Sequence, residues 1–271
     1  MVRIIEKEHI APNVYSCKIS APDIAQKALP GHFVIVIPDE FSERIPITIA
    51  DWDTTEGSVT IVFLNIGAST QRLAELKPGD NIYSFTGPLG NPFEIKKFGT
   101  VGLVGGCYGI GGIYQAAKAL KEKGNKVICF SEARSKFLLY WNEKLESVSD
   151  EVRYSTTDAS LGDPGHSHDL LKKNLKDGEH FDRIMAVGCT FMMYKIAQVT
   201  KPLGIKTIVS MNPVMIDGTG MCGACRLVVG DETKFACVDG PHFDAHEINW
   251  DIVLTRRNAY LEEEIISKER W

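Results

Sequence analysis

A group of metal-ligating side chains lies between residues 217 and 237. Asp217, Cys222 and Cys225 are separated by four and two residues within a glycine-rich run, and Cys237 follows further along the chain. Plant-type [2Fe-2S] sites place cysteines as C-x₄-C-x₂-C, with a distant fourth ligand. Asp217 stands where the first cysteine of that pattern would be. The spacing therefore predicts a [2Fe-2S] cluster held by the carboxylate of Asp217 and the thiolates of Cys222, Cys225 and Cys237.

Two other interpretations of these cysteines stay open at this point. A closed zinc site of three cysteines and one histidine is an alternative, because His242 and His246 follow shortly after Cys237. Plain redox or structural thiols are a second alternative. A disulfide framework is disfavoured, since the chain has seven cysteines, an odd number.

A glycine-rich turn is the second chemically informative stretch. Gly105–Gly112 follows the apolar run Val101–Val104 and precedes helical apolar spacing from Ile113 to Lys123. Strand, glycine turn and helix form the first unit of a nucleotide-binding sheet. The turn departs from strict G-x-G-x-x-G, so a tight turn that only lets a helix pack on a strand is the alternative.

Composition narrows the class of protein. The chain has 271 residues, 44% of them hydrophobic, and a formal charge of −5, which argues against a nucleic-acid surface. No apolar run is long enough to span a bilayer, and residues 1–10 do not resemble a signal peptide. We therefore expect a cytoplasmic protein, in a reducing compartment that suits iron–sulfur thiolates.

The first part of the chain is predicted to be an antiparallel β-barrel. Short segments rich in Val, Ile, Thr and aromatic residues, bounded by turn signals, predict strands at 2–10, 12–20, 32–38, 45–51, 58–64 and 80–86. One helix is expected from Thr70 to Leu76, with Ser69 or Thr70 as its N-cap. Its start, preceded by Gly67-Ala68, would be an anion site because free backbone N–H groups point outward.

The second part alternates strands and helices, which predicts a parallel sheet wrapped by helices. Strands are expected at 101–104, 127–131, 152–155, 184–187 and 206–210, and helices at 113–123, 138–145, 169–175 and 191–199. Helical spacing returns in the tail from Leu254 to Trp271, a candidate partner surface. The predicted domains are a barrel (1–98), an α/β domain (99–212), a small cluster domain (213–250) and a helical tail (251–271).

Beyond the strand predicted at 127–131, two charged residues bear on nucleotide choice. Glu132 is placed to accept hydrogen bonds from a ribose 2′-hydroxyl and to repel a 2′-phosphate, which favours NAD over NADP. Arg134 would reverse that choice by pairing with the phosphate, or would stack on adenine.

Several motifs together resemble the ferredoxin-reductase superfamily, over nearly the whole chain. Pro30–Phe33 is similar to its P-G-Q-F strand, and Arg44–Thr48 to its flavin motif, in which the arginine holds pyrophosphate and the next residues line the flavin. Gly87–Gly90 is similar to its G-P-L-G turn. Gly188 and Met192 fall on its C-G-P-x-x-M segment, although Val187 and Cys189 replace the cysteine and the proline.

This resemblance implies the cofactors FAD, NAD(H) and a [2Fe-2S] cluster, with no catalytic side chain. The implied FAD-binding residues are Arg44, Pro46, Ile47, Thr48, Gly67, Ala68, Ser69 and Thr70. The implied nucleotide-binding residues are Gly105, Gly106, Gly109, Ile110, Gly111, Gly188 and Met192, with Glu132 and Arg134.

The cluster run D-G-T-G-M-C-G-A-C-R, at 217–226, favours one branch of this superfamily. It is similar to the small subunits of electron-bifurcating transhydrogenases, whereas electron-transfer subunits of dihydroorotate dehydrogenase have a fourth cysteine at the position of Asp217. The resemblance implies a larger flavoprotein partner that carries its own FAD and [4Fe-4S] clusters. An electron-transfer subunit of dihydroorotate dehydrogenase and a zinc-stabilised nucleotide-binding redox sensor are the alternatives.

Overall fold

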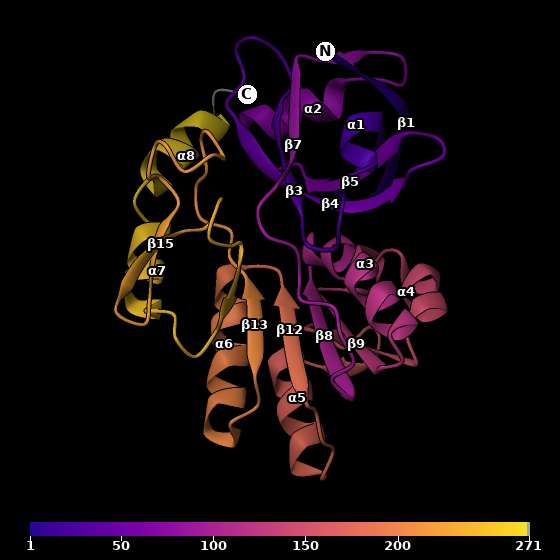
Figure 1. The fold of residues 1–271 in the computed structure, drawn as a ribbon, viewed down its shortest axis with the longest axis vertical. Coiled ribbons are helices and arrows are strands. Elements are labelled where there is room, and N and C mark those ends of the chain that lie inside the picture. The colour runs from indigo at the N-terminus through magenta and orange to yellow at the C-terminus, as the bar shows by residue number, and fades with distance from the viewer. Residues whose placement is uncertain (270–271) are drawn as a thin grey trace. The chain divides into compact units, whose positions relative to one another are not determined.

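The computed structural model describes residues 1–269, and their side chains up to residue 267. The chain divides into two compact units. Unit 1 comprises residues 1–91, 213–240 and 249–271, and unit 2 comprises residues 92–212 and 241–248. The chain thus leaves unit 2 twice: residues 213–240 contain the predicted cluster ligands and belong to unit 1, residues 241–248 return to unit 2, and the residues from 249 onward belong to unit 1 again (Figure 1).

Unit 1 contains the antiparallel barrel that the sequence predicts. Its strands are β1 (Val2–Ala11), β2 (Val14–Ser20), β3 (Phe33–Ile37), β4 (Ile45–Asp53), β5 (Ser58–Leu64), β6 (Asn81–Ile82) and β7 (Ser84–Leu89), in the spatial order β6-β1-β2-β5-β4-β3-β7. Alternate side chains such as Ile19, Ile49 and Ile61 fill its core. The expected single strand at 80–86 is wrong, because the chain changes partner there: β6 pairs with β1 and β7 with β3. The short helix α1 (Pro22–Ala25) was not predicted.

The helix of the barrel, α2 (Ala68–Glu75), begins earlier than predicted. Its N-cap is Gly67, and the predicted caps Ser69 and Thr70 lie inside the first turn. The Thr70 hydroxyl oxygen accepts the N–H groups of Ile66 and Gly67, at 3.1 and 3.0 Å. The threonine therefore stabilises the helix start from within the helix rather than from the cap position.

Unit 2 is a doubly wound sheet, as predicted. Its strands are β8 (Thr100–Gly106), β9 (Lys126–Ala133), β10 (Glu151–Thr156), β11 (Asp163–Pro164), β12 (Arg183–Val187), β13 (Thr207–Ser210) and β16 (His242–Asp244), in the order β11-β10-β9-β8-β12-β13-β16. Its helices are α3 (Gly109–Glu122), η1 (Lys136–Leu138), α4 (Asn142–Val148), α5 (Ser167–Lys176), α6 (Thr190–Thr200) and η2 (Lys201–Leu203). The helix predicted to start at residue 138 starts at Asn142, because Trp141 before it has left-handed backbone, with φ of 55°.

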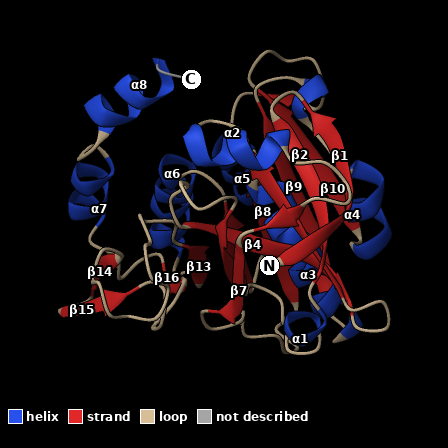
Figure 2. Cartoon of the chain, turned by 90° about the horizontal axis from the view of Figure 1, so that it is seen from above, coloured by secondary structure: helices blue, strands red, loops and turns tan. Residues whose placement is uncertain are grey.

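The strand order reverses between β8 and β12. From β8 the chain winds through α3 and α4 to β10, then crosses back through α5 to β12 and α6. Right-handed crossovers in opposite directions place α3 and α4 on one face and α5 and α6 on the other (Figures 1 and 2). Ligands of such sheets bind beyond the carboxyl ends of the strands at this reversal point, where Gly105–Gly112 and Gly188 lie.

The remaining elements follow the predicted cluster loop in the chain. They are the hairpin β14 (Arg226–Val229) and β15 (Glu232–Phe235), followed by α7 (Trp250–Arg257) and α8 (Leu261–Glu269). β16 pairs with β13, so residues 242–244 complete the second sheet although the predicted cluster domain includes them. The predicted helical tail corresponds to α7 and α8, and its last two residues lie outside the described range. No helix within residues 1–269 has the length and apolar character needed to cross a membrane.

Candidate functional site

The predicted cluster ligands fall into two pairs. Cys225 and Cys237 are buried, and their sulfur atoms lie 3.3 Å apart across the base of the β14–β15 hairpin. Burial, followed by the neighbouring Cys225 thiol, raises the pKa of Cys237 to about 12. Two thiolates at this separation need a neutralising cation, and iron supplies one.

Asp217 and Cys222 form the second pair, on an exposed loop. The two carboxylate oxygens of Asp217 accept the N–H groups of Thr219 at 2.9 Å and of Cys222 at 2.8 Å. These bonds, Thr219 first, lower the pKa of Asp217. The carboxylate therefore orders the loop, and its oxygens are also donor atoms of the kind that can ligate iron. Two irons with two protein ligands each is the arrangement that a [2Fe-2S] cluster requires.

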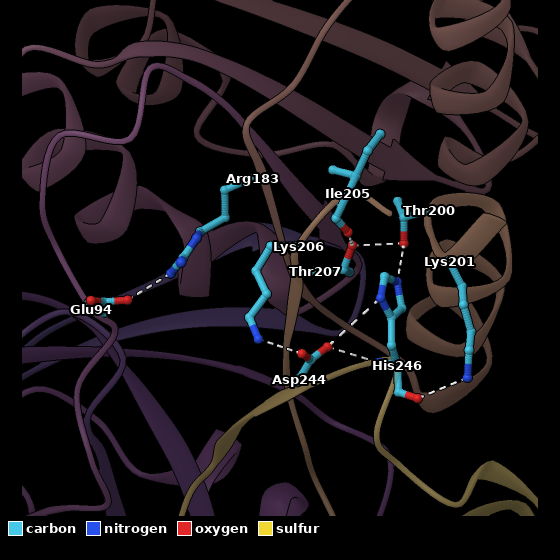
Figure 3. A network of polar contacts seen from close by, with 9 residues as sticks. All are labelled: Glu94, Arg183, Thr200, Lys201, Ile205, Lys206, Thr207, Asp244 and His246. Atoms are coloured by element: carbon cyan, nitrogen blue, oxygen red, sulfur yellow. Dashed lines mark hydrogen bonds and ion pairs between the residues drawn. The ribbon is translucent and has the colours of Figure 1, made fainter. Parts of the chain in front are cut away.

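No three His, Cys, Asp or Glu side chains within the described residues converge closely enough to hold a single metal ion. The histidines of the zinc alternative are engaged elsewhere, in unit 2. His246 Nε2 lies 2.9 Å from the Thr200 hydroxyl, and its carbonyl accepts the Lys201 ammonium at 3.0 Å (Figure 3). The His242 ring stacks on Phe93, with centroids 3.6 Å apart. Both imidazoles therefore serve to anchor the β16 segment to the second sheet.

The two predicted flavin segments lie side by side on the barrel. The Ser69 hydroxyl, in the first turn of α2, accepts the backbone N–H of Glu43 at 3.0 Å. This bond brings the chain just before Arg44 to the start of α2. Pro46 and Thr48 are half-buried on β4, whereas Ile47 between them faces the barrel core. Ile47 can therefore contact a flavin only through its backbone.

Arg44 connects the flavin motif with the cluster loop. Its Nε atom donates to the carbonyl of Ile216, and its Nη2 atom donates to the carbonyl of Asp217 at 3.2 Å. The next residue, Gly218, has φ of 77°, and a Cβ there would lie 2.9 Å from side-chain atoms of Ile35 and Leu89. The start of the cluster loop is thus packed against β3 and β7. No local sequence pattern predicts this contact, because the partners are far apart in the chain.

The nucleotide loop packs tightly against the end of β12. A Cβ on Gly109 would lie 1.9 Å from the carbonyl oxygen of Val187, so only glycine fits at the start of α3. Met192 packs its thioether against both Gly106 and Gly188. The side chain of Ile110 is fully buried and so anchors this end of the loop in the core. The structure therefore brings the two predicted nucleotide segments together.

Tyr140 holds this loop in shape, and the sequence analysis missed it. Its hydroxyl accepts the N–H of Gly111 at 3.0 Å and lies 3.1 Å from the carbonyl oxygens of both Cys107 and Tyr108, to which it donates. Tyr140 is buried, which raises the pKa of its phenol far above the ordinary range. Its OH group therefore stays protonated and bonds to the turn both at Cys107-Tyr108 and at Gly111.

We expect Tyr140→Phe to lower the free energy of unfolding by about 1 to 3 kcal/mol, because the buried N–H of Gly111 loses its acceptor. The affinity for a pyridine nucleotide should fall as the loop loosens. Tyr154→Phe is the matched control, since the hydroxyl of Tyr154 donates to the exposed carboxylate of Glu146. Thermal unfolding and nucleotide titration check both variants, and equal losses in the two would contradict the role of Tyr140.

Glu132 is engaged differently from the prediction. Its carboxylate accepts from the backbone N–H and the hydroxyl of Ser167, and it lies 2.7 Å from His166 Nδ1. These contacts fix the first turn of α5 to the end of β9. Arg134, two residues further on, is exposed. His166 and Ser167 thus take up part of the acceptor capacity of Glu132.

We expect Glu132→Ala to weaken the preference for NADH over NADPH by removing negative charge near the ribose 2′ position. His166→Ala leaves that charge in place and should keep the preference, although it removes one contact of the loop. The ratio of the two dissociation constants is the measurement. If both variants change the ratio equally, Glu132 acts only by positioning the loop.

Several known proteins are similar to this chain. Residues 212–249 match the iron-sulfur cluster binding domain of dihydroorotate dehydrogenase B. A dihydroorotate dehydrogenase B electron transfer subunit homolog from Thermotoga maritima is 43% identical over 99% of this chain and 94% of the relative. The dihydroorotate dehydrogenase B electron transfer subunit of Enterococcus faecalis is 30% identical, over 92% of this chain and 97% of the relative.

The solved structure of an NADH-dependent reduced ferredoxin-NADP oxidoreductase, described in connection with flavin-based electron bifurcation, contains a chain that superimposes with a TM-score of 0.94. That chain is 42% identical, and the match covers 100% of this chain and 97% of the other. Because these relatives are at least 30% identical over almost the whole chain, this chain belongs to the family of dihydroorotate dehydrogenase B electron-transfer subunits and their homologues.

Proposed function

We propose that this protein is the FAD-, NAD(H)- and [2Fe-2S]-binding electron-transfer subunit of a flavin-based bifurcating ferredoxin-NADP oxidoreductase. The observation that carries the proposal is the full-length similarity to the solved oxidoreductase chain. Asp217 at the first ligand position supports this choice over the dihydroorotate dehydrogenase subunit, which resembles the chain but carries a cysteine there. The cytoplasm is the proposed compartment.

The protein groups position the bound cofactors and neutralise the negative charge of their phosphates. Arg44 has two donors on the cluster loop and further N–H groups left for a flavin phosphate. The glycine loop and the start of α6 present backbone N–H groups to a dinucleotide at the reversal point of the sheet. When bound, a flavin accepts two electrons as a hydride and releases them singly, as transfer from a nicotinamide to an iron–sulfur cluster requires. No side-chain acid or base is needed.

Anaerobic purification followed by absorption spectroscopy tests this proposal. The protein should be yellow-brown, contain FAD and about two irons per chain as a [2Fe-2S] cluster requires, and lose its flavin absorption when NADH is added. A colourless protein with one zinc would support the redox-sensor alternative instead. A spectrum that NADH leaves unchanged would contradict the nucleotide assignment.

The proposed partner is a larger flavoprotein subunit that carries FAD and [4Fe-4S] clusters. Met221, beside the ligand Cys222, is 87% exposed, and Ile265 and Ile266 of α8 are also exposed. An electron donor needs an apolar contact surface for its partner, and these exposed side chains are candidates for it. Met221→Glu and Ile265→Glu should each reduce co-purification of the partner while iron and flavin content stay constant. Identification of a dihydroorotate dehydrogenase as the bound chain would favour the alternative.

A further inference from the structure

Two exposed thiols have no role in the proposed electron transfer. All seven cysteines lie within the described residues: Cys17, Cys129, Cys225 and Cys237 are buried, and Cys107, Cys189 and Cys222 are exposed. Cys222 is a predicted cluster ligand. Cys107 lies in the nucleotide loop after β8, and Cys189 lies in the turn after β12. Both are therefore available to reagents from solution.

The sheet places these two thiols at the same edge. β8 and β12 are parallel neighbours in which Gly105 pairs with Val187, so Cys107 and Cys189 each follow the paired residue by two positions. Neighbouring strands lie about 4.8 Å apart, and disulfides join Cα atoms roughly 4.4 to 6.8 Å apart. The two turns are also in contact, because a Cβ on Gly188 would lie 3.1 Å from the carbonyl oxygen of Gly106.

The backbone around Cys107 is held in an uncommon conformation. Cys107 has φ of 52°, in the left-handed region that glycine normally occupies. The Tyr140 hydroxyl holds its carbonyl, and its N–H donates to the carbonyl of Glu132 at 3.2 Å. On the other side, the Cys189 sulfur accepts the N–H of Met192 at 3.4 Å at the start of α6. Both cysteines are thus fixed by contacts of their own at the reversal point.

We propose that Cys107 and Cys189 are a reversible redox pair, which a low-molecular-weight disulfide such as glutathione disulfide converts into an intramolecular disulfide that closes the nucleotide site. The effect of the disulfide on nucleotide binding rests on the proposed function, whereas the formation of the disulfide between the two thiols does not.

The chemistry is two successive thiol–disulfide exchanges. The Cys189 thiolate attacks one sulfur of glutathione disulfide, and one glutathione thiolate leaves. The Cys107 thiolate then attacks the Cys189 sulfur of the mixed disulfide, and the second glutathione leaves. The two cysteines lose two protons and two electrons, and two glutathione thiols form. A dithiol reductant reverses both steps.

The order of attack follows from the surroundings of Cys107. Although the residue is exposed overall, burial of its sulfur raises the pKa of the Cys107 thiol to about 11, and Cys189 and Glu132 raise it further in the same direction. The Tyr140 phenol, the other titratable group close to it, stays neutral and adds no charge. Cys107 is therefore the resolving thiol, and ring closure should accelerate about tenfold for each unit of pH below that value.

Closure would affect nucleotide binding because the new bond ties the two turns across the carboxyl ends of β8 and β12. A dinucleotide and the disulfide then compete for one edge of the sheet. By linkage, bound nucleotide must disfavour the disulfide at equilibrium by the same factor by which the disulfide weakens nucleotide binding.

The test uses the cofactor-loaded protein, anaerobic, with its iron content measured before and after each step. Glutathione disulfide should remove two titratable thiols without loss of iron, and peptide mapping should show one linked pair, Cys107 with Cys189. Dithiothreitol should restore both thiols. Cys107→Ser should stop at a glutathione adduct on Cys189, and Cys189→Ser should form no linked product. Separate adducts on both cysteines of the wild-type protein would overturn the redox pair.

The effect of the disulfide on the nucleotide site is tested separately. Each oxidised protein is compared with the same protein after dithiothreitol treatment. In the wild-type protein with free thiols, NADH should reduce the flavin. After glutathione disulfide has formed the Cys107–Cys189 bond, most of that flavin reduction should be lost. Added NAD should slow disulfide formation. If the disulfide forms and flavin reduction is unchanged, closure of the site is wrong, although the pair exists. If NADH fails with the reduced protein, the proposed function is wrong and the thiol mapping is unaffected.

Discussion

Asp217→Ala is expected to lose most of the cluster, with iron retention reduced by about 10- to 100-fold, the range found when a group that orients metal ligands is removed. The carboxylate has two tasks here, and alanine performs neither. It leaves the N–H groups of Thr219 and Cys222 without their acceptor, and it takes away the predicted fourth ligand. Iron analysis and the visible spectrum of the anaerobic protein are the measurements.

Two further substitutions separate ligation from loop order. Asp217→Asn keeps one acceptor oxygen for one of the two N–H groups and removes the charge, so the loop should keep part of its order while the cluster is weakened. Asp217→Cys supplies a thiolate and should retain a [2Fe-2S] cluster with an altered spectrum and midpoint potential, since thiolate is the softer ligand. His242→Ala and His246→Ala should leave the spectrum unchanged. A spectrum and potential indifferent to all three Asp217 substitutions would remove Asp217 from the ligand set.

Arg44→Ala should deplete the protein of flavin and also weaken the cluster loop. The guanidinium bonds to the carbonyls of Ile216 and Asp217, and its remaining donors are those assigned to the flavin phosphate. Each hydrogen bond from a charged donor contributes about 1.5 to 3 kcal/mol, with the lower end appropriate for this half-exposed side chain. Flavin and iron content after dialysis are the measurements.

Arg44→Lys is the control for charge. Lysine keeps the positive charge but cannot present the planar fork that reaches two carbonyls and a phosphate together. It should retain part of the flavin and little of the loop order, so the rate of iron loss to a chelator should resemble that of the alanine variant. Full flavin occupancy in Arg44→Ala after dialysis would contradict the assignment of Arg44 to both sites.

Local patterns predicted the elements and the ligand types. The alternation of short β segments predicted the barrel, and the alternation of strands with helices predicted the doubly wound sheet, because side-chain periodicity is a property of neighbouring residues. The spacing of Asp217, Cys222 and Cys225 predicted a cluster loop for the same reason. A loop that wraps iron must present its ligands from closely spaced positions, so its signature is written in consecutive residues.

Which strands pair with each other was decided only by the tertiary structure. Whether residues 80–86 form one strand or two depends on which distant strands accept their hydrogen bonds, and β1 and β3 each take a part. The pairing of β16 with β13, which removes His242 and His246 from the cluster region, likewise joins segments without a common local pattern.

The contacts that shape the candidate sites have the same origin. Arg44 reaches the carbonyls of Ile216 and Asp217, Tyr140 reaches the turn at Cys107, and Glu132 reaches Ser167. In each case a side chain bonds to a backbone group, and every residue presents the same N–H and C=O groups whatever its side chain. The sequence by itself therefore determined which residues can carry the chemistry, and the fold decided what holds them in place, because backbone partners carry no sequence signature.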